Sequence, residues 1–265
     1  MNEILIAIVS VAAIGLICSV LLAVASKVMH VEVDLRMSQV RDCLPGANCG
    51  ACGYSGCNAF ATAIVEDDAK TTLCTPGGNE VAEQINNILG LGAGEGVSKL
   101  VAVVHCIGDL DTKTEKLEYG GIRTCAAAKL LFKGQNACSF GCIGFGDCVS
   151  RCPSDAICIE RGLARVDKRR CTGCGICAKF CPSKIITTEK YPASVVVMCS
   201  NTEKGGVLKD KCSAGCIGCM KCVKECPADA IRVVDFLAGI DYEKCTGCKR
   251  CIEVCPKGCI VGFHI

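Results

Sequence analysis

The sequence predicts an α+β protein that combines an apolar N-terminal helix, a small helical module and two duplicated cysteine-rich units. Two observations carry this prediction. The chain contains 28 cysteines in 265 residues, most of them in closely spaced runs, and residues 4–25 form an apolar stretch. Cysteines so close together are poorly placed for disulfides but well placed to ligate metal clusters. Cluster ligands must stay reduced, so we expect a cytoplasmic location for the cysteine-rich body.

The apolar stretch is long enough for one transmembrane helix, which needs about 20 residues. A cleaved signal peptide is the alternative, and Ala23-Val24-Ala25 resembles a cleavage site. A retained membrane anchor is favoured because residues 1–3 carry no Lys or Arg and the stretch exceeds a signal core of about 7–15 residues. Lys27 follows it, and positive flanks face the cytoplasm. Residues 31–39 are interpreted as a linker.

A small 4Fe-4S module is predicted next. Its motif runs Leu-Pro-Gly-Ala-Asn-Cys-Gly-Ala-Cys-Gly-Tyr-Ser-Gly-Cys from Leu44, and sixteen residues separate its last cysteine from a further one. The glycines allow the backbone to approach a cluster. The predicted ligands are Cys49, Cys52, Cys57 and Cys74. Zinc is the alternative occupant, and a helix is expected over residues 58–69.

The region 78–100 is expected to be a flexible connection. Its glycine-rich part, residues 90–96, does not match a nucleotide-binding loop because the predicted strand follows it instead of preceding it. That strand covers Val101–His105, and a short helix begins near Arg123. His105 is interpreted as a structural residue, with metal binding as the alternative.

The clearest cysteine runs start at Cys216 and Cys245. Each reads Cys-x-x-Cys-x-x-Cys-x-x-x-Cys-Pro, the pattern of a bacterial ferredoxin with two 4Fe-4S clusters, in which the fourth Cys of each run ligates the other cluster. Paired zinc sites or disulfides are the alternative. The predicted ligands are Cys216, Cys219, Cys222 and Cys255 for one cluster, and Cys245, Cys248, Cys251 and Cys226 for the second.

Residues 138–182 repeat this unit with one departure. Phe145 stands where the repeat requires the counterpart of Cys219. Either a three-iron cluster forms there or Cys138 supplies the missing thiolate, and we favour Cys138. The predicted ligands are then Cys138, Cys142, Cys148 and Cys181 for this cluster, and Cys171, Cys174, Cys177 and Cys152 for its neighbour. A strand that ends in Cys precedes each unit, at residues 101–106 and 195–199.

Five clusters use twenty cysteines and leave eight others. Four of these are candidates for a sixth site: Cys106, Cys125, Cys199 and Cys212. Cys158 and Cys259 are expected on packing strands. Cys18 is interpreted as a packing residue of the apolar helix, and Cys43 is either a spare thiol or a competing ligand of the 4Fe-4S module. The predicted domains are residues 1–30 (transmembrane anchor), 31–80 (4Fe-4S module), 81–135 (flexible connection and small α/β segment), 136–190 (first dicluster ferredoxin unit) and 191–265 (second dicluster ferredoxin unit).

Charge is distributed unevenly along the chain. Residues 31–100 contain four Lys or Arg and nine Asp or Glu, whereas residues 136–265 contain nineteen and thirteen. The basic part is interpreted as a docking face for an acidic redox partner, with ordinary solvated surface as the alternative. Nucleic acid is a poor fit as a partner, since there is no long basic run and no aromatic platform.

In the order of these modules, the chain resembles the B subunits of Rnf complexes, which are membrane-bound ferredoxin:NAD⁺ oxidoreductases that couple electron flow to Na⁺ or H⁺ transport. The resemblance implies an electron-transfer subunit that accepts electrons from soluble ferredoxin and passes them to the other Rnf subunits. The sequence contains no catalytic residue set, no nicotinamide motif and one candidate membrane span. The alternatives are an electron-transfer subunit of another membrane complex, such as a hydrogenase, and a structural zinc protein.

Overall fold

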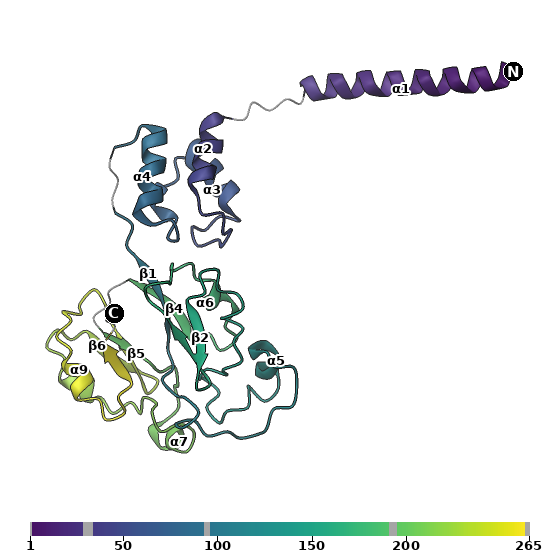
Figure 1. Ribbon diagram of the computed structural model, residues 1–265. Coiled ribbons are helices and arrows are strands. Elements are labelled where there is room, and N and C mark those ends of the chain that lie inside the picture. Colours follow the sequence, from purple (N-terminus) through teal and green to yellow (C-terminus); the bar gives the residue numbers. More distant parts are fainter. Residues whose placement is uncertain (1, 29–33, 93–95, 191–194, 263–265) are drawn as a thin grey trace.

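Figure 1 shows the computed structural model, in which a long helix and a three-helix module precede two small β-containing units. The structure describes residues 2–28, 34–92, 96–190 and 195–262. Residues 93–95 of the expected flexible connection and residues 31–33 of the expected linker lie outside this description.

The first helix, α1, spans Asn2–Val28 and is rich in apolar residues. Large side chains along it, such as Ile6 and Leu22, are 66% and 71% exposed. Among the residues whose side chains are described, no helix is long and apolar enough to cross a membrane. The transmembrane anchor therefore stays a prediction.

The helical module contains α2 (Leu35–Cys43), α3 (Cys57–Glu66), a 3₁₀ turn η1 (Thr71–Leu73) and α4 (Gly78–Leu89). Phe60 of α3 and Ile85 of α4 are fully buried in its core. The helix predicted from residue 58 is thus confirmed as α3, with slightly different ends.

Two expectations for this region are wrong. The linker predicted for residues 31–39 is helical from Leu35, because Asp34 accepts a hydrogen bond from the Arg36 N–H and caps α2. The flexible connection expected from residue 78 is instead α4 as far as Leu89. Gly90 ends α4 in the left-handed conformation, at a φ of 68°, where glycine is favoured. The helical module therefore continues nine residues beyond its predicted end at residue 80.

The first β-containing unit consists of two antiparallel strand pairs. β1 (Leu100–Val104) pairs with β4 (Ile186–Lys190), and β2 (Ile157–Glu160) pairs with β3 (Leu163–Val166). Its helices are α5 (Cys125–Leu130) and α6 (Ile176–Phe180). The predicted strand and short helix are confirmed as β1 and α5. Since β1 pairs with the last strand, it belongs structurally to this unit rather than to a separate 81–135 segment.

The second unit repeats the strand pairing of the first. β5 (Val195–Val197) pairs with β8 (Ile260–Gly262), and β6 (Ile231–Val234) pairs with β7 (Leu237–Ile240). Its short helices are α7 (Gly205–Lys209), α8 (Lys221–Lys224) and α9 (Arg250–Glu253). The Asp167 N–H donates to the Ala156 carbonyl at 2.7 Å, and the Asp241 N–H donates to the Ala230 carbonyl at the same distance. The duplication read from the sequence is therefore also a duplication of backbone geometry.

The two units are joined through β5. Val196 is buried in the core of the first unit, whereas its neighbours Val195 and Val197 are buried in the core of the second. This follows from the alternation of side chains along a strand. The ring of His105 bonds the Val197 carbonyl through Nδ1 and the Thr187 hydroxyl through Nε2, each at 2.7 Å. His105 thus has the structural contacts expected from its position at a strand end.

Gly173→Ala is predicted to destabilise the protein by roughly 1–3 kcal/mol. Gly173 has a φ of +69°, and a Cβ there would lie 2.5 Å from the backbone oxygen of Leu100, which a side-chain rotation cannot relieve. Thermal unfolding followed by circular dichroism measures the effect. Gly239→Ala is the control, because nothing lies within 4 Å of the new Cβ. Equal loss in both variants would contradict this account.

Candidate metal centres

All 28 cysteines lie in the described part of the chain, and all are free thiols. No group of three or more His, Cys, Asp or Glu among the described residues is arranged to coordinate one common metal ion. Most of the cysteines instead come together in groups of four, several of which surround a cavity. Bringing buried thiols close together makes most of them harder to ionise, which raises their pKa values.

The helical module brings together the four cysteines predicted for it. Burial raises the pKa of the Cys74 thiol, and nearby Cys49, Cys57 and Cys52 raise it further. Asn48 fixes the loop, because its side-chain oxygen accepts the Cys57 N–H at 2.9 Å at the start of α3. A Cβ on Gly56 would lie 2.9 Å from that same oxygen, so the motif needs a glycine there.

In the first β-containing unit, the cysteines of the regularly spaced run lie together with Cys152, as predicted. Burial raises the pKa of Cys177 to about 12, and repulsion from Cys171, Cys174 and Cys152 adds to this effect. Backbone N–H groups point at two of these sulfurs. The Ala156 N–H donates to Cys152 Sγ at 3.3 Å, and the Ala102 N–H of β1 donates to Cys171 Sγ at 3.4 Å.

The second group of this unit differs from the prediction. A cavity of about 350 Å³ is lined by Cys142, Cys148 and Cys181 together with Cys125, and Cys138 is not among its lining residues. Burial raises the pKa of Cys148 to about 12, with further contributions from Cys142, Cys125, Cys177 and Cys181. In the structure, Cys125 therefore lies with Cys142, Cys148 and Cys181, whereas Cys138 lines a different cavity.

The position of Cys125 follows from local capping of α5. The Asp147 carboxylate accepts the N–H groups of Cys125 and Ala126 at 2.8 and 3.0 Å, and the Thr124 hydroxyl oxygen accepts the Ala127 N–H. Asp147 directly precedes Cys148, so the carboxylate links α5 to the cysteine run. In the sequence, the helix-capping residue Thr124 was the available indication that Cys125 begins a helix. Asp147, which binds the Cys125 N–H, lies 22 residues away from Cys125 in the chain.

Phe145 explains why a distant cysteine is needed. Its ring lies 5.6 Å from that of Tyr119, and the Arg123 guanidinium lies over it at 5.4 Å. Phe145 and Tyr119 pack against a buried cluster that includes Cys125. The residue that replaces the expected cysteine thus helps to hold the segment that supplies another one.

The second β-containing unit gathers its cysteines as predicted. Cys216, Cys219, Cys222 and Cys255 line a cavity of about 340 Å³. Burial raises the pKa of Cys222 to about 11, with repulsion from the other three as a further cause. Burial also raises the pKa of Cys251, and Cys248, Cys245 and Cys226 raise it further.

Cys259 lines the same cavity as a fifth sulfur. Its Sγ lies 3.7 Å from Cys255 Sγ, and it is fully buried before β8. A hydrogen bond between the Cys216 and Cys259 thiols lowers the pKa of Cys216 to about 6 and raises the pKa of Cys259. Cys259 thus lies beside the four predicted ligands, although the spacing of the regular run does not include it. Cys158 lies on β2 and is exposed.

The chemistry of these groups fits iron–sulfur clusters. Thiolates are the ligands such clusters require, and backbone N–H groups directed at the sulfurs favour a negatively charged centre. The raised thiol pKa values indicate that gathering the thiols without a bound cation favours protonated sulfur, so cluster binding releases protons. When bound, the clusters supply one-electron chemistry, and the chain holds and shields them.

Comparisons with known proteins agree with this chemistry. Residues 44–76 match a family model described as an Fe-S cluster, residues 170–230 and 215–259 match 4Fe-4S dicluster domains, and residues 142–156 match a 4Fe-4S binding domain. The B subunit of the Na⁺-translocating ferredoxin:NAD⁺ oxidoreductase complex from Acetobacterium woodii is 42% identical over 99% of this chain and 79% of its own length.

Two further relatives share 42% identity with the chain. One is the B subunit of the ion-translocating oxidoreductase complex of Methanosarcina acetivorans, with 88% of each chain covered. The other is the B subunit of the proton-translocating ferredoxin:NAD⁺ oxidoreductase complex of Clostridium ljungdahlii, with 91% of this chain and 85% of that protein covered. The chain therefore belongs to the family of B subunits of Rnf complexes, the ion-translocating ferredoxin:NAD⁺ oxidoreductases.

Proposed function

We propose that this chain is the electron-transfer subunit of a membrane-bound Rnf complex, which takes electrons from reduced ferredoxin and relays them through 4Fe-4S clusters to the other subunits. The observation that carries the proposal is the repeated grouping of four thiols along the chain, most of them buried or half-buried. The names of the relatives supply the reaction, and they differ in the coupling ion, Na⁺ or H⁺.

The proposed cluster ligands follow the groups described above, with Cys125 in place of Cys138. They are Cys49, Cys52, Cys57 and Cys74; Cys125, Cys142, Cys148 and Cys181; Cys152, Cys171, Cys174 and Cys177; Cys216, Cys219, Cys222 and Cys255; and Cys226, Cys245, Cys248 and Cys251.

Electron entry is proposed at the C-terminal unit. Among these twenty ligands, only Cys219 and Cys248 are exposed. Exposed basic residues stand within five positions of them in the sequence, namely Lys221, Lys224, Lys244, Lys249 and Arg250. An exposed ligand shortens the distance to a docked donor, and a basic rim attracts an acidic one.

Electron exit is proposed through the helical module, with α1 as its membrane anchor. Lys179 of α6 donates a hydrogen bond to the Cys49 carbonyl at 3.4 Å, which joins the first β-containing unit to the loop of the N-terminal cluster. This contact links two neighbouring cluster sites. The anchor would then hold the N-terminal cluster beside the membrane subunits, on the cytoplasmic side.

Replacing Lys249 and Arg250 with Glu is predicted to lower the second-order rate of reduction by an acidic ferredoxin about tenfold at low salt. Stopped-flow absorbance of the anaerobically purified protein measures this rate. Lys70→Glu is the control, because it changes an exposed charge in the helical module. Salt should slow the parent reaction and abolish the difference. If reduced ferredoxin fails to reduce the purified protein, that result contradicts the proposed function itself.

Removal of residues 1–30 is predicted to move the chain, expressed without other subunits, from the membrane fraction to the soluble fraction. The physical reason is the loss of the apolar helix α1. Immunoblots of fractionated cells measure the distribution, and the full chain is the control. Membrane retention of the shortened chain would contradict the anchor.

Cys125→Ser is predicted to remove about four iron atoms per chain, or to leave a three-iron cluster with its own EPR signal in the oxidised state. Iron and sulfide analysis with EPR checks this. Cys158→Ser is the matched control, since Cys158 is exposed and belongs to none of the groups. A parent-like iron content and spectrum in Cys125→Ser would argue for another ligand in this position.

A further inference from the structure

We propose that Cys106, Cys138, Cys199 and Cys212 bind a sixth 4Fe-4S cluster between the two β-containing units. The proposal rests on the proposed function only in taking iron–sulfur clusters as the cofactors of this chain. It also corrects the sixth site expected from the sequence, since Cys138 takes the place of Cys125.

A cavity brings these four cysteines together. They line one pocket whose open space, about 330 Å³ including solvent at its mouth, is close to the 340 and 350 Å³ of the pockets at the Cys216 and Cys142 groups. Apolar side chains complete its wall, including Phe140, Met198 and Leu208. Three of the four cysteines are less than 9% exposed, and Cys199 is half-buried. The cavity therefore matches the size and shielding of the sites that carry a ferredoxin pattern.

The internal repeat supplies the four thiols as two matching pairs, one from each unit. Cys106 and Cys199 follow the equivalent strands β1 and β5, whereas Cys138 and Cys212 lie four residues before the equivalent Cys142 and Cys216. Two equivalent hydrogen bonds accompany them. The Cys142 N–H donates to Cys106 Sγ at 3.4 Å, and the Cys216 N–H donates to Cys199 Sγ at 3.3 Å.

Further donors and open space surround these sulfurs. Asn201, only 1% exposed, donates from Nδ2 to Cys138 Sγ at 3.4 Å and from its backbone to Cys199 Sγ at 3.5 Å. A Cβ on Gly108 would lie 3.2 Å from Cys212 Sγ, and one on Gly141 would lie 3.5 Å from Cys106 Sγ. Buried N–H groups that point at sulfur favour a ligated thiolate, and the glycines leave the sulfurs accessible from the cavity.

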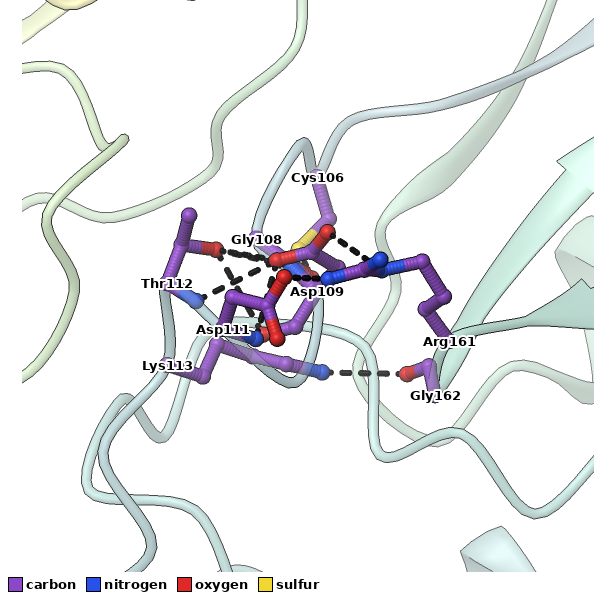
Figure 2. Close-up of polar contacts among 8 residues, drawn as sticks. All are labelled: Cys106, Gly108, Asp109, Asp111, Thr112, Lys113, Arg161 and Gly162. Atoms are coloured by element: carbon purple, nitrogen blue, oxygen red, sulfur yellow. Dashed lines mark hydrogen bonds and ion pairs between the residues drawn. The ribbon is translucent and has the colours of Figure 1, made fainter.

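Lys113 places a buried positive charge beside the same cavity. Its ammonium donates to the carbonyls of Cys142 and Gly162 at 3.0 Å each, and the residue is 8% exposed. Figure 2 shows how the surrounding loop is held, with Arg161 bonded to Asp109 and Asp111. A fixed cation next to four thiolates offsets part of their mutual repulsion.

The position of the site gives it a role in the relay. Cys142 lines the cavity of the first unit and Cys216 lines that of the second, and each donates its N–H to a sulfur of the central group. The proposed central cluster would gain one electron from one unit and then lose it to the other, with no bond formed or broken. The central site therefore joins the two ferredoxin-like units into one chain of clusters.

The test compares iron, acid-labile sulfide and zinc in the anaerobically purified full chain and in Cys212→Ser. We expect the variant to lose about four iron and four sulfide, with the EPR signals of the other clusters retained. Cys158→Ser is the control. An iron content equal to that of the control, or the loss of zinc in place of iron, would overturn the proposal.

If Cys212→Ser fails to fold, the iron content of the parent protein provides a second test. About 24 iron atoms per chain support the sixth cluster, whereas about 20 overturn it. Both results differ from failure of the proposed function, for which the parent would contain no iron–sulfur clusters.

Discussion

The gathering of thiols into groups of four is the constraint on which the rest of this structure depends. Each group concentrates sulfur atoms that repel one another when ionised, and burial raises this cost, as the pKa of about 12 at Cys106, Cys148 and Cys177 indicates. A bound cluster supplies the positive charge that removes the cost. Strands of three to five residues and helices of four to six in the two β-containing units are consistent with a fold organised around such centres.

Phe145 shows how one change in this arrangement is compensated. A cysteine in the repeat is replaced by an aromatic side chain, which stacks near Tyr119 and under Arg123. Those contacts hold the segment from which α5 begins, and Asp147 then fixes Cys125 at the start of that helix. The group still contains four sulfurs because packing and capping bring a thiol from another part of the chain.

The duplication has a second consequence at the junction of the units. In an isolated ferredoxin-like unit, Cys106 and Cys138, or Cys199 and Cys212, would be only two thiols. The shared strand β5, with Val196 in one core and Val195 in the other, places the two pairs around one cavity. Repetition of a unit thus creates a four-sulfur group that neither copy contains alone.

Short-range spacing in the sequence by itself determined most of the groups. Three cysteines two residues apart fix a loop whose geometry depends on local backbone, and the fourth comes from the Cys-Pro ending of the other run in the same repeated pattern. The groups of Cys177, Cys222 and Cys251 therefore contain the cysteines expected from the spacing. Only the tertiary structure placed Cys125 in the Cys142 group and Cys138 in another. It also joined β1 to β4 and made residues 78–89 a helix packed on α2. These outcomes depend on contacts between residues far apart in the chain, whose energies are set by packing and hydrogen bonding rather than by spacing.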